Sequence, residues 1–395
     1  MKNKIILLVV SLVAGLMICE GITRLIRPAS DIFPAQPAID PLLGHRILPF
    51  QSGHDARGFR NADAAGDFPV VCIGDSQMYG AGIARESAIP QQLGRMINQR
   101  VYNMGMGGYG PVQYYQLSKQ ARGLHPQKII IAFFLGNDLL DAYFMAERNE
   151  PWRWLQQEMG PEKQLDSIPP CSQHVEPLNI HDLYYAPEVI TLQLKQRGSL
   201  IWRVHSFLRL HSALYALQYE CVVKPLVQRL FERKKYLSQP GAFACPQIDT
   251  IFTPGLDLKR IDLQDRLVRQ GILITQRIIE LMARDYPRGA LLFTFIPTKE
   301  AVYYNYLKKA KVPLPRAFTC CVHYEKAATA WLTRVINAAG LQVVDVFPAL
   351  EKAALDGKLL YHFTSDAHLN AAGARIVATC LAQALEKEGK AAQPR

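Results

Sequence analysis

Five short apolar runs, separated by longer stretches with helical periodicity, constrain the fold of this chain more than any other feature. The runs occupy residues 70–73, 101–103, 128–134, 290–296 and 342–346. The helical patterns fall near residues 86–99, 112–123, 262–285, 324–339 and 371–387. Asn370 is a suitable N-cap for the last helix. Strands that are apolar throughout and alternate with helices form parallel sheets covered on both faces. We therefore expect an α/β fold of three layers around a central, mostly parallel sheet.

The N-terminal segment has the pattern of a membrane-targeting helix. Lys2 and Lys4 precede an uncharged apolar run over residues 5–19, which ends at Glu20. The run is shorter than the ~20 residues of a spanning helix, but it extends further if Glu20 lies at the membrane interface. We interpret residues 1–27 as an uncleaved, single-pass signal anchor, with a cleaved signal peptide as the alternative. The rest of the chain is then expected to be extracytoplasmic, in the periplasm.

Composition and pattern divide the remaining chain. With 49% apolar and 20% charged residues, the chain has ample material for a core. We expect a linker over residues 28–57, one domain over residues 58–388 and a tail over residues 389–395. The strand–helix alternation stops over residues 142–254, which predicts a large, mainly helical insertion.

One part of this insertion, residues 199–235, has an amphipathic helical pattern. Packing over the sheet is the preferred interpretation, and a helix that binds a membrane surface or a partner is the alternative. The net charge of +11 is partly concentrated at residues 224–235, either as a solvated helix face or as a surface facing anionic lipid or an acidic polymer. No aromatic platform interleaves these basic residues, so we expect no nucleic-acid partner.

The eight cysteines fit an oxidising compartment. Five of them lie in less regular sequence and are candidates for disulfides, with the pairing left open: Cys171, Cys221, Cys245, Cys320 and Cys321. None of their spacings is typical of a zinc site. We expect neither a metal nor a cofactor.

Polar and glycine residues gather where the predicted strands end. Ser76 follows the first strand within Gly-Asp-Ser, and a glycine-rich loop containing Gly105 follows the second. Asn137 follows the third strand, and Asp366 and His368 lie near the C-terminus. In open α/β sheets the ligand site lies beyond the carboxyl ends of the strands, so these residues are the candidate site.

Together these residues supply the roles that acyl transfer needs. A serine hydroxyl becomes nucleophilic when a base takes its proton, which assigns Ser76 as nucleophile and His368 as base. Asp366 would hold the imidazole tautomer and stabilise the imidazolium. The backbone N–H groups of Ser76 and Gly105 and the side-chain amide of Asn137 would form the oxyanion hole. Asp75 is expected to brace the turn, and His323 and His362 are expected to be structural.

These blocks resemble the SGNH (GDSL-like) hydrolase family, over about residues 58–388 outside the insertion. Gly-Asp-Ser, the glycine loop, Gly136-Asn137-Asp138 and the Asp/His pair carry the resemblance. The segments "ARGFRN" (56–61) and "IPTKEAVYY" (296–304) resemble membrane-anchored members from bacterial polysaccharide systems. The family usually places Asp three residues before His, whereas Asp366 is two before His368. That spacing resembles proteins that O-acetylate alginate and related exopolysaccharides.

The resemblance implies a flavodoxin-like SGNH fold and a serine esterase that deacetylates or O-acetylates an extracytoplasmic carbohydrate. Its partners would be an acyl-ester substrate, the membrane and polysaccharide-biosynthesis proteins. Polysaccharide O-acetyltransferase is the alternative, because the triad does not distinguish water from a sugar hydroxyl as acceptor. A non-catalytic glycan-binding or scaffold subunit is the competing hypothesis from another class. A phosphoesterase is less favoured, because the chain has no P-loop and no metal-ligand cluster.

Overall fold

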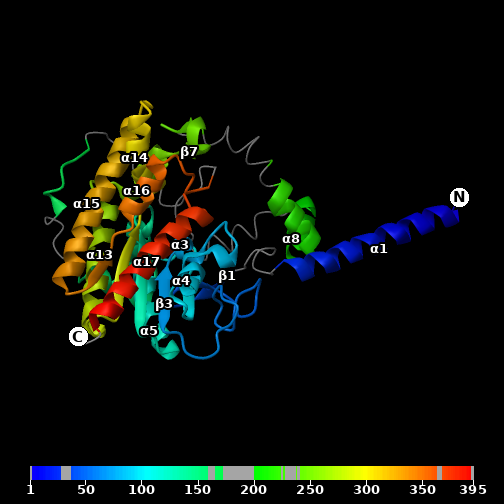
Figure 1. Ribbon diagram of the computed structural model, residues 1–395, viewed down its shortest axis with the longest axis horizontal. Helices are drawn as coiled ribbons and strands as arrows, with labels where there is room; N and C mark the ends of the chain where they lie inside the picture. The colour runs from blue at the N-terminus through cyan, green and yellow to red at the C-terminus, as the bar shows by residue number, and fades with distance from the viewer. Residues whose placement is uncertain are drawn as a thin grey trace.

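A five-stranded parallel sheet forms the centre of the computed structural model (Figure 1). The structure describes residues 2–27, 37–158, 165–171, 200–223, 226, 237, 241–362 and 367–392. The strand order is β4 (Val101–Gly105), β3 (Val70–Gly74), β5 (Lys128–Phe134), β8 (Leu291–Ile296) and β9 (Gln342–Val344). Each neighbouring pair is parallel. Counted along the chain, this is the 2-1-3-4-5 order of flavodoxin-like sheets, which confirms the expected fold class.

Helices cover both faces of the sheet and make the three layers. Alternate residues of a strand point to opposite faces, so Val71 and Ile73 belong to one hydrophobic cluster, and Val70 and Cys72 to the other. The first cluster includes buried residues of α5 (Pro111–Ala121), α6 (Asp138–Arg148) and α13 (Arg266–Asp285). The second includes those of α4 (Ile89–Ile97), α14 (Lys299–Lys309), α16 (Phe347–Leu355) and α17 (Ala371–Ala392). Helix α15 (Arg316–Ala338) contributes to both.

Local signals explain where several helices begin. Asp265 accepts hydrogen bonds from the N–H groups of Leu267 and Val268 at the start of α13. Asn370 Oδ1 accepts from the N–H groups of Ala372 and Gly373, which confirms it as the N-cap of α17. Of the helices that cover the sheet, α6, α14 and α16 were not predicted. The first turn of α14 buries charged side chains, so its apolar periodicity is weak in the sequence.

The segment before the sheet is more ordered than the irregular lead-in expected for it. Residues Pro37–Asp40 (β1) and Gly44–Ile47 (β2) form an antiparallel hairpin. Leu43, Ile47 and Phe59 are buried in the first hydrophobic cluster. The lead-in therefore packs on the body, while the proposed division of the chain into domains stays a prediction.

Helix α1 (Lys2–Ile26) extends away from the body (Figure 1). Its segment Lys4–Ile26 is long and apolar enough to cross a membrane, with a mean hydropathy of 2.6. The described part of the insertion includes two short helices, α8 (Leu200–His211) and α9 (Ala213–Gln218), and a π-helical turn, Tyr219–Val223. In place of the expected packing over the sheet, α9 contacts α1. The basic residues 224–235 lie outside the described residues, apart from Leu226.

The insertion returns to the body through a hairpin and a further helix. Strands β6 (Phe243–Cys245) and β7 (Thr250–Phe252) pair antiparallel, and α12 (Pro254–Ile261) follows and contacts α15. A disulfide joins Cys171 to Cys320 of α15, with 5.6 Å between their Cα atoms. Among the other candidate cysteines, Cys245 and Cys321 are buried thiols and Cys221 is an exposed thiol. The pairing left open by the sequence is therefore Cys171–Cys320.

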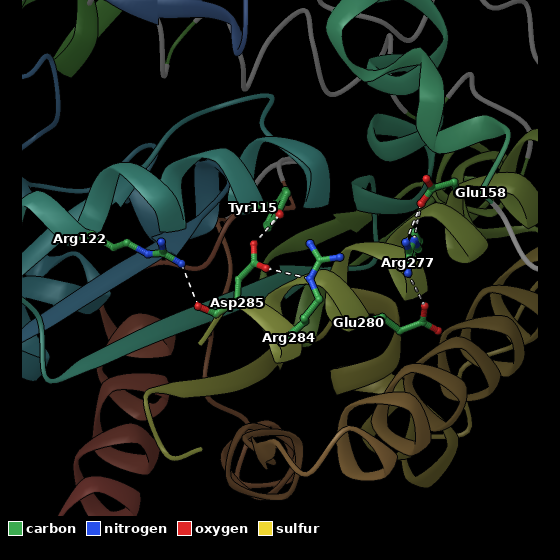
Figure 2. Close-up of polar contacts among 7 residues, drawn as sticks. All are labelled: Tyr115, Arg122, Glu158, Arg277, Glu280, Arg284 and Asp285. Atoms are coloured by element: carbon green, nitrogen blue, oxygen red, sulfur yellow. Dashed lines mark hydrogen bonds and ion pairs between the residues drawn. The ribbon is translucent and has the colours of Figure 1, made fainter. Parts of the chain in front are cut away.

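Polar contacts on the surface tie α13 to its neighbours (Figure 2). Tyr115 Oη of α5 donates to Asp285 Oδ2 at 2.6 Å, and Arg122 Nη2 donates to the Asp285 carbonyl at 2.9 Å. About two turns earlier in α13, Arg277 pairs with Glu158, which follows the 3-10 helix Glu150–Gln156, at 2.6 Å. These contacts hold three chain segments together on the side of the sheet that carries α5, α6 and α13.

Candidate active site

The residue expected to be the nucleophile stands on a tight turn between a strand and a helix. Strand β3 ends at Gly74, and the four-residue helix α3 (Ser76–Tyr79) begins directly after Asp75. Asp75 Oδ1 caps this helix by accepting from the Gln77 N–H at 2.8 Å. Gly80 ends it with φ of +79°, a left-handed conformation that favours glycine. Asp75 therefore braces the turn as expected, and the turn leaves Ser76 partly exposed at the carboxyl end of β3.

His368 is brought against Ser76 from the other end of the chain. Its Nε2 atom lies 2.7 Å from Ser76 Oγ, a hydrogen-bonding distance. The segment that carries His368 is held by an isolated bridge between Tyr361 and Leu369, and by the His362 N–H, which donates to the His368 carbonyl at 3.1 Å. Two of the predicted site residues, which are 292 positions apart, are thus in direct contact.

Gln77 links the turn that carries Ser76 to the segment that carries His368. Its Nε2 donates to the Ala367 carbonyl at 2.9 Å, and its Oε1 accepts from the Leu369 N–H at 3.0 Å. These two residues flank His368 on either side, and the Gln77 side chain is 3% exposed. A buried side chain that satisfies both backbone groups fixes where His368 lies relative to Ser76. Sequence reasoning missed Gln77, and its position next to Ser76 was the only available signal.

Two residues of the segment "ARGFRN", Arg60 and Asn61, hydrogen-bond to the loop after α3 and to strand β4. The Arg60 guanidinium donates to the Gly80 carbonyl at 2.8 Å and to the Ile83 carbonyl at 2.9 Å. These carbonyls follow α3, whose C-terminal end favours a nearby cation. Asn61 Oδ1 accepts from the Asn103 N–H at 2.9 Å, which connects this segment to the middle of β4. The sequence predicted a family resemblance for this segment, and the structure gives it a positioning role.

The glycine-rich loop after β4 lies directly against α3. A Cβ on Gly105 would stand 2.3 Å from the Tyr79 nitrogen, so only glycine allows the strand end to meet the helix. The Gly105 N–H donates to Asn103 Oδ1 at 2.8 Å, so that group is engaged, and its role in an oxyanion hole stays a prediction. Gly107 of the same loop lies close to Ser76: a Cβ placed on it would be 3.8 Å from Ser76 Cβ.

Asn137 follows β5 and begins α6. Its side-chain Nδ2 donates to Asp141 Oδ2 at 2.5 Å, one helical turn along. An amide group carries two N–H donors, so this contact orients the side chain and leaves the second donor for another acceptor. Neighbouring Asp138 is fully buried, and it accepts hydrogen bonds from the Phe134 N–H and from Tyr114 Oη.

Three acidic side chains lie near one another at this edge of the sheet. Burial raises the pKa of Asp75 to about 6, although the Gln77 N–H and the nearby His368 oppose the shift. Burial also raises the pKa of Asp141 to about 7, against the hydrogen bond from Asn137 and the charge of Arg260. Asp138 has its pKa raised well above the usual range by burial and by the charge of Asp75. The interior next to Ser76 is therefore poorly solvated around these carboxyls, which favours their neutral forms.

The sequence also singled out Asp366, His362 and His323. Asp366 lies outside the described residues, so its assignment as the third member of a triad stays a prediction. His362 Nε2 lies 3.4 Å from the Ala81 carbonyl, in the loop after α3. His323 contacts the Pro169 carbonyl at 3.1 Å, beside the disulfide. Both histidines are in structural contacts. Within the described ranges, no group of three or more His, Cys, Asp or Glu side chains has an arrangement that could hold a metal ion.

Part of the chain matches the model of a known protein family. Residues 270–395 match the family model described as "SGNH hydrolase-like domain, acetyltransferase AlgX". The SGNH resemblance is confirmed. The matched region contains His368 and the segment 296–304, whereas Ser76, Gly105 and Asn137 lie before it.

The chain was also compared with curated proteins and with solved structures. No curated protein matches the chain. A solved structure, LAE5, an alpha/beta hydrolase enzyme from the metagenome of Lake Arreo, Spain, has 11% sequence identity and a TM-score of 0.36, over 82% of this chain and 97% of that one. The SGNH assignment therefore depends on the family match and on the contact between Ser76 and His368.

Proposed function

We propose that this protein is a membrane-anchored serine esterase or O-acyltransferase that deacetylates or O-acetylates an extracytoplasmic carbohydrate. The observation that carries the proposal is the 2.7 Å contact between His368 Nε2 and Ser76 Oγ at the carboxyl edge of the sheet. In flavodoxin-like sheets this edge, beside the first strand, is where ligands bind. The family match to an acetyltransferase domain supports an acetyl group as the acyl group and a polysaccharide as its carrier.

In the first half of the reaction, Ser76 Oγ attacks the acyl carbonyl carbon while His368 Nε2 takes the hydroxyl proton. The tetrahedral intermediate collapses, the bond to the leaving oxygen breaks, and His368 returns the proton to that oxygen. The product is an acyl ester on Ser76. In the second half, His368 deprotonates the acceptor, which is water or a sugar hydroxyl. Acceptor attack on the acyl carbon then releases Ser76 and restores the proton to its Oγ.

The negative charge that develops on the carbonyl oxygen needs preorganised donors. We assign the Ser76 N–H, the second N–H of the Asn137 amide and a backbone N–H of the loop 105–108 to this role. The bond from Asn137 to Asp141 supports the assignment, because it fixes the amide before substrate arrives. Gly105 can donate only by exchanging its bond to Asn103, whereas Gly107 is the loop residue that lies against Ser76.

Two features support an extracytoplasmic location. Helix α1 has the length and composition of a membrane span near the N-terminus, and we assign it as a signal anchor. The disulfide between Cys171 and Cys320 is typical of oxidising compartments such as the periplasm. Polysaccharide-biosynthesis proteins in the same membrane are the partners that this location and the family match favour.

A donor and acceptor assay tests the proposal. The protein is incubated with an aryl acetate, with and without an oligosaccharide acceptor, and both free acetate and acetylated sugar are measured. An esterase releases acetate at the same rate with or without the acceptor, whereas a transferase diverts the acetyl group to the sugar. If wild type and Ser76→Ala release acetate equally and neither acetylates the sugar, the proposal is wrong.

A further inference from the structure

Helix α8 carries an apolar stripe that faces away from its neighbours. Leu200, Ile201, Val204 and Phe207 follow the i, i+1, i+4, i+7 spacing of one helix face, and Ile201 and Phe207 are 83% and 60% exposed. The contacts to the next helical segments come from a different side. His205 Nδ1 lies 2.8 Å from Tyr215 Oη, and the Arg209 guanidinium lies over the Tyr219 ring. The stripe is therefore exposed although α8 packs against α9 and the turn that follows it. Below, α8 and α9 are called the helix pair.

Helix α1 holds this helix pair at its C-terminal end. Glu20 accepts hydrogen bonds from the N–H groups of Ala213 and Leu214 and from Ser212 Oγ, all between 2.7 and 2.9 Å. Arg24 Nη2 donates to the His211 carbonyl at 2.7 Å. Glu20 thus satisfies the free N–H groups that begin α9, in the way a helix cap does. The apolar run 5–19 of α1 ends where this contact begins.

The residues around the stripe are suited to a membrane interface. If α1 spans a bilayer through its apolar run, Glu20 and Arg24 lie at the level of the lipid headgroups. Helix α8 lies beside the C-terminal end of α1 (Figure 1), and its last residue, His211, accepts the bond from Arg24. Arg27 near the C-terminal end of α1 and Arg203 in the first turn of α8 are both exposed and would meet anionic headgroups. Helices with an apolar face and basic flanks lie in the plane of the membrane interface. Val222 and Val223, 61% and 44% exposed, extend the apolar surface beyond α9.

We propose that the apolar stripe of α8 rests on the lipid bilayer into which α1 inserts, as a second, peripheral membrane contact. This inference rests on the proposed membrane insertion of α1 and is independent of the chemistry at Ser76. Two contacts with one bilayer restrict rotation of the protein about α1. The helical insertion then fixes the orientation of the protein relative to the membrane surface.

Lipid quenching in the full-length protein tests this inference. A fluorescent amino acid replaces Phe207, or in a second variant Ile201, and each protein is reconstituted in vesicles of phosphatidylethanolamine and phosphatidylglycerol. Nitroxide lipids labelled at the headgroup or deep in the acyl chain serve as quenchers. Leu16 of α1, which is 52% exposed, is the control position expected inside the bilayer. Leu355 of α16, which is 37% exposed, is the control position expected in water, away from lipid.

Headgroup nitroxides are expected to remove most of the fluorescence at positions 207 and 201 and little at position 355, while deep nitroxides quench position 16. If position 16 is quenched but positions 207 and 201 behave like position 355, the inference is wrong and the anchor stands. If position 16 is not quenched, both are wrong. If positions 207 and 201 are shielded from lipid quenchers and from aqueous iodide alike, a second copy or another protein covers the stripe, and the inference is again wrong.

Discussion

His368 Nε2 and Ser76 Oγ lie 2.7 Å apart, although 292 positions of sequence separate the two residues. The contact exists because β3 and the segment before α17 both end at the carboxyl edge of the sheet. A base within hydrogen-bonding distance is what a serine hydroxyl needs to become a nucleophile.

Gln77 is expected to position His368, and the substitution Gln77→Leu tests this. Loss of its two bonds to residues 367 and 369 should lower kcat with little change in KM, because His368 loses its fixed place beside Ser76. The matched control is Gln92→Leu, because Gln92 is also buried and donates to two backbone carbonyls, Ser87 and Ala371. Both variants should lose about 1–3 kcal/mol of stability. Equal kcat values for the two variants would show that Gln77 is only structural.

Asp366 and Asp75 are the two carboxyl candidates for supporting His368, and Asn substitutions separate them. We expect Asp366→Asn to lower the rate of acetyl-ester turnover by roughly 10²- to 10⁴-fold, because the imidazole loses its partner. Asp75→Asn keeps a side-chain oxygen for the Gln77 N–H, so the turn and most of the activity should remain. Steady-state kinetics with an aryl acetate measures both. A larger loss for Asp75→Asn would assign the supporting role to Asp75.

The pH dependence of stability should report the partly buried Asp141. Burial raises its pKa to about 7, so the folded protein binds a proton that the unfolded chain releases near pH 4. The contribution of this group is therefore present at low pH and is lost as the pH rises through 7. In Asp141→Asn this loss disappears, so the free energy of unfolding should fall by roughly 1–2 kcal/mol less than in wild type between pH 4.5 and 7.5.

Denaturant unfolding of detergent-solubilised protein at several pH values checks this prediction. Asn at position 141 can still accept from Asn137, so the comparison isolates the titration. Parallel curves for the two proteins would contradict the prediction.

The disulfide should make a separate contribution to stability. Cys171→Ser and Cys320→Ser are each expected to destabilise the protein by about 2–5 kcal/mol, because both remove the same cross-link. The double variant should be no less stable than either single one. Exposed Cys221 is the control position, and Cys221→Ser should leave the free energy of unfolding unchanged. Additive losses in the double variant would exclude a bond between the two sulfurs.

The sequence predicted the sheet because its strands are buried on both faces. Residues 129–134 are all buried, so an unbroken apolar run is the only pattern that fits them. The five strands of the central sheet agree with the five runs that were predicted. Helix α14 was missed because Lys299 and Glu300 are buried in its first turn, with Lys299 Nζ donating to the Ile251 carbonyl at 2.7 Å. Periodicity does not reveal a charged residue that is buried with a distant partner.

The candidate site was predictable to a different extent. Ser76 and His368 were found because strand ends meet at one edge, whatever the loops between them do. The contacts of Arg60 and Gln77 were missed, because both side chains bind backbone groups whose positions depend on the whole fold. The bond from the Gly105 N–H to Asn103 is of the same kind. Residue type predicts the chemistry of a group, but its hydrogen-bond partner is determined only by the assembled fold.

Labelling with a serine-directed fluorophosphonate tests the central claim most directly, because it requires no knowledge of the substrate. Wild-type protein should be labelled at Ser76, as located by peptide mass spectrometry, and Ser76→Ala should not be labelled. His368→Ala should react more slowly by roughly 10³-fold or more, because the hydroxyl loses its base. Equal labelling of the wild-type protein and both variants, or no labelling of the folded wild-type protein, would contradict the claim that Ser76 is an activated nucleophile.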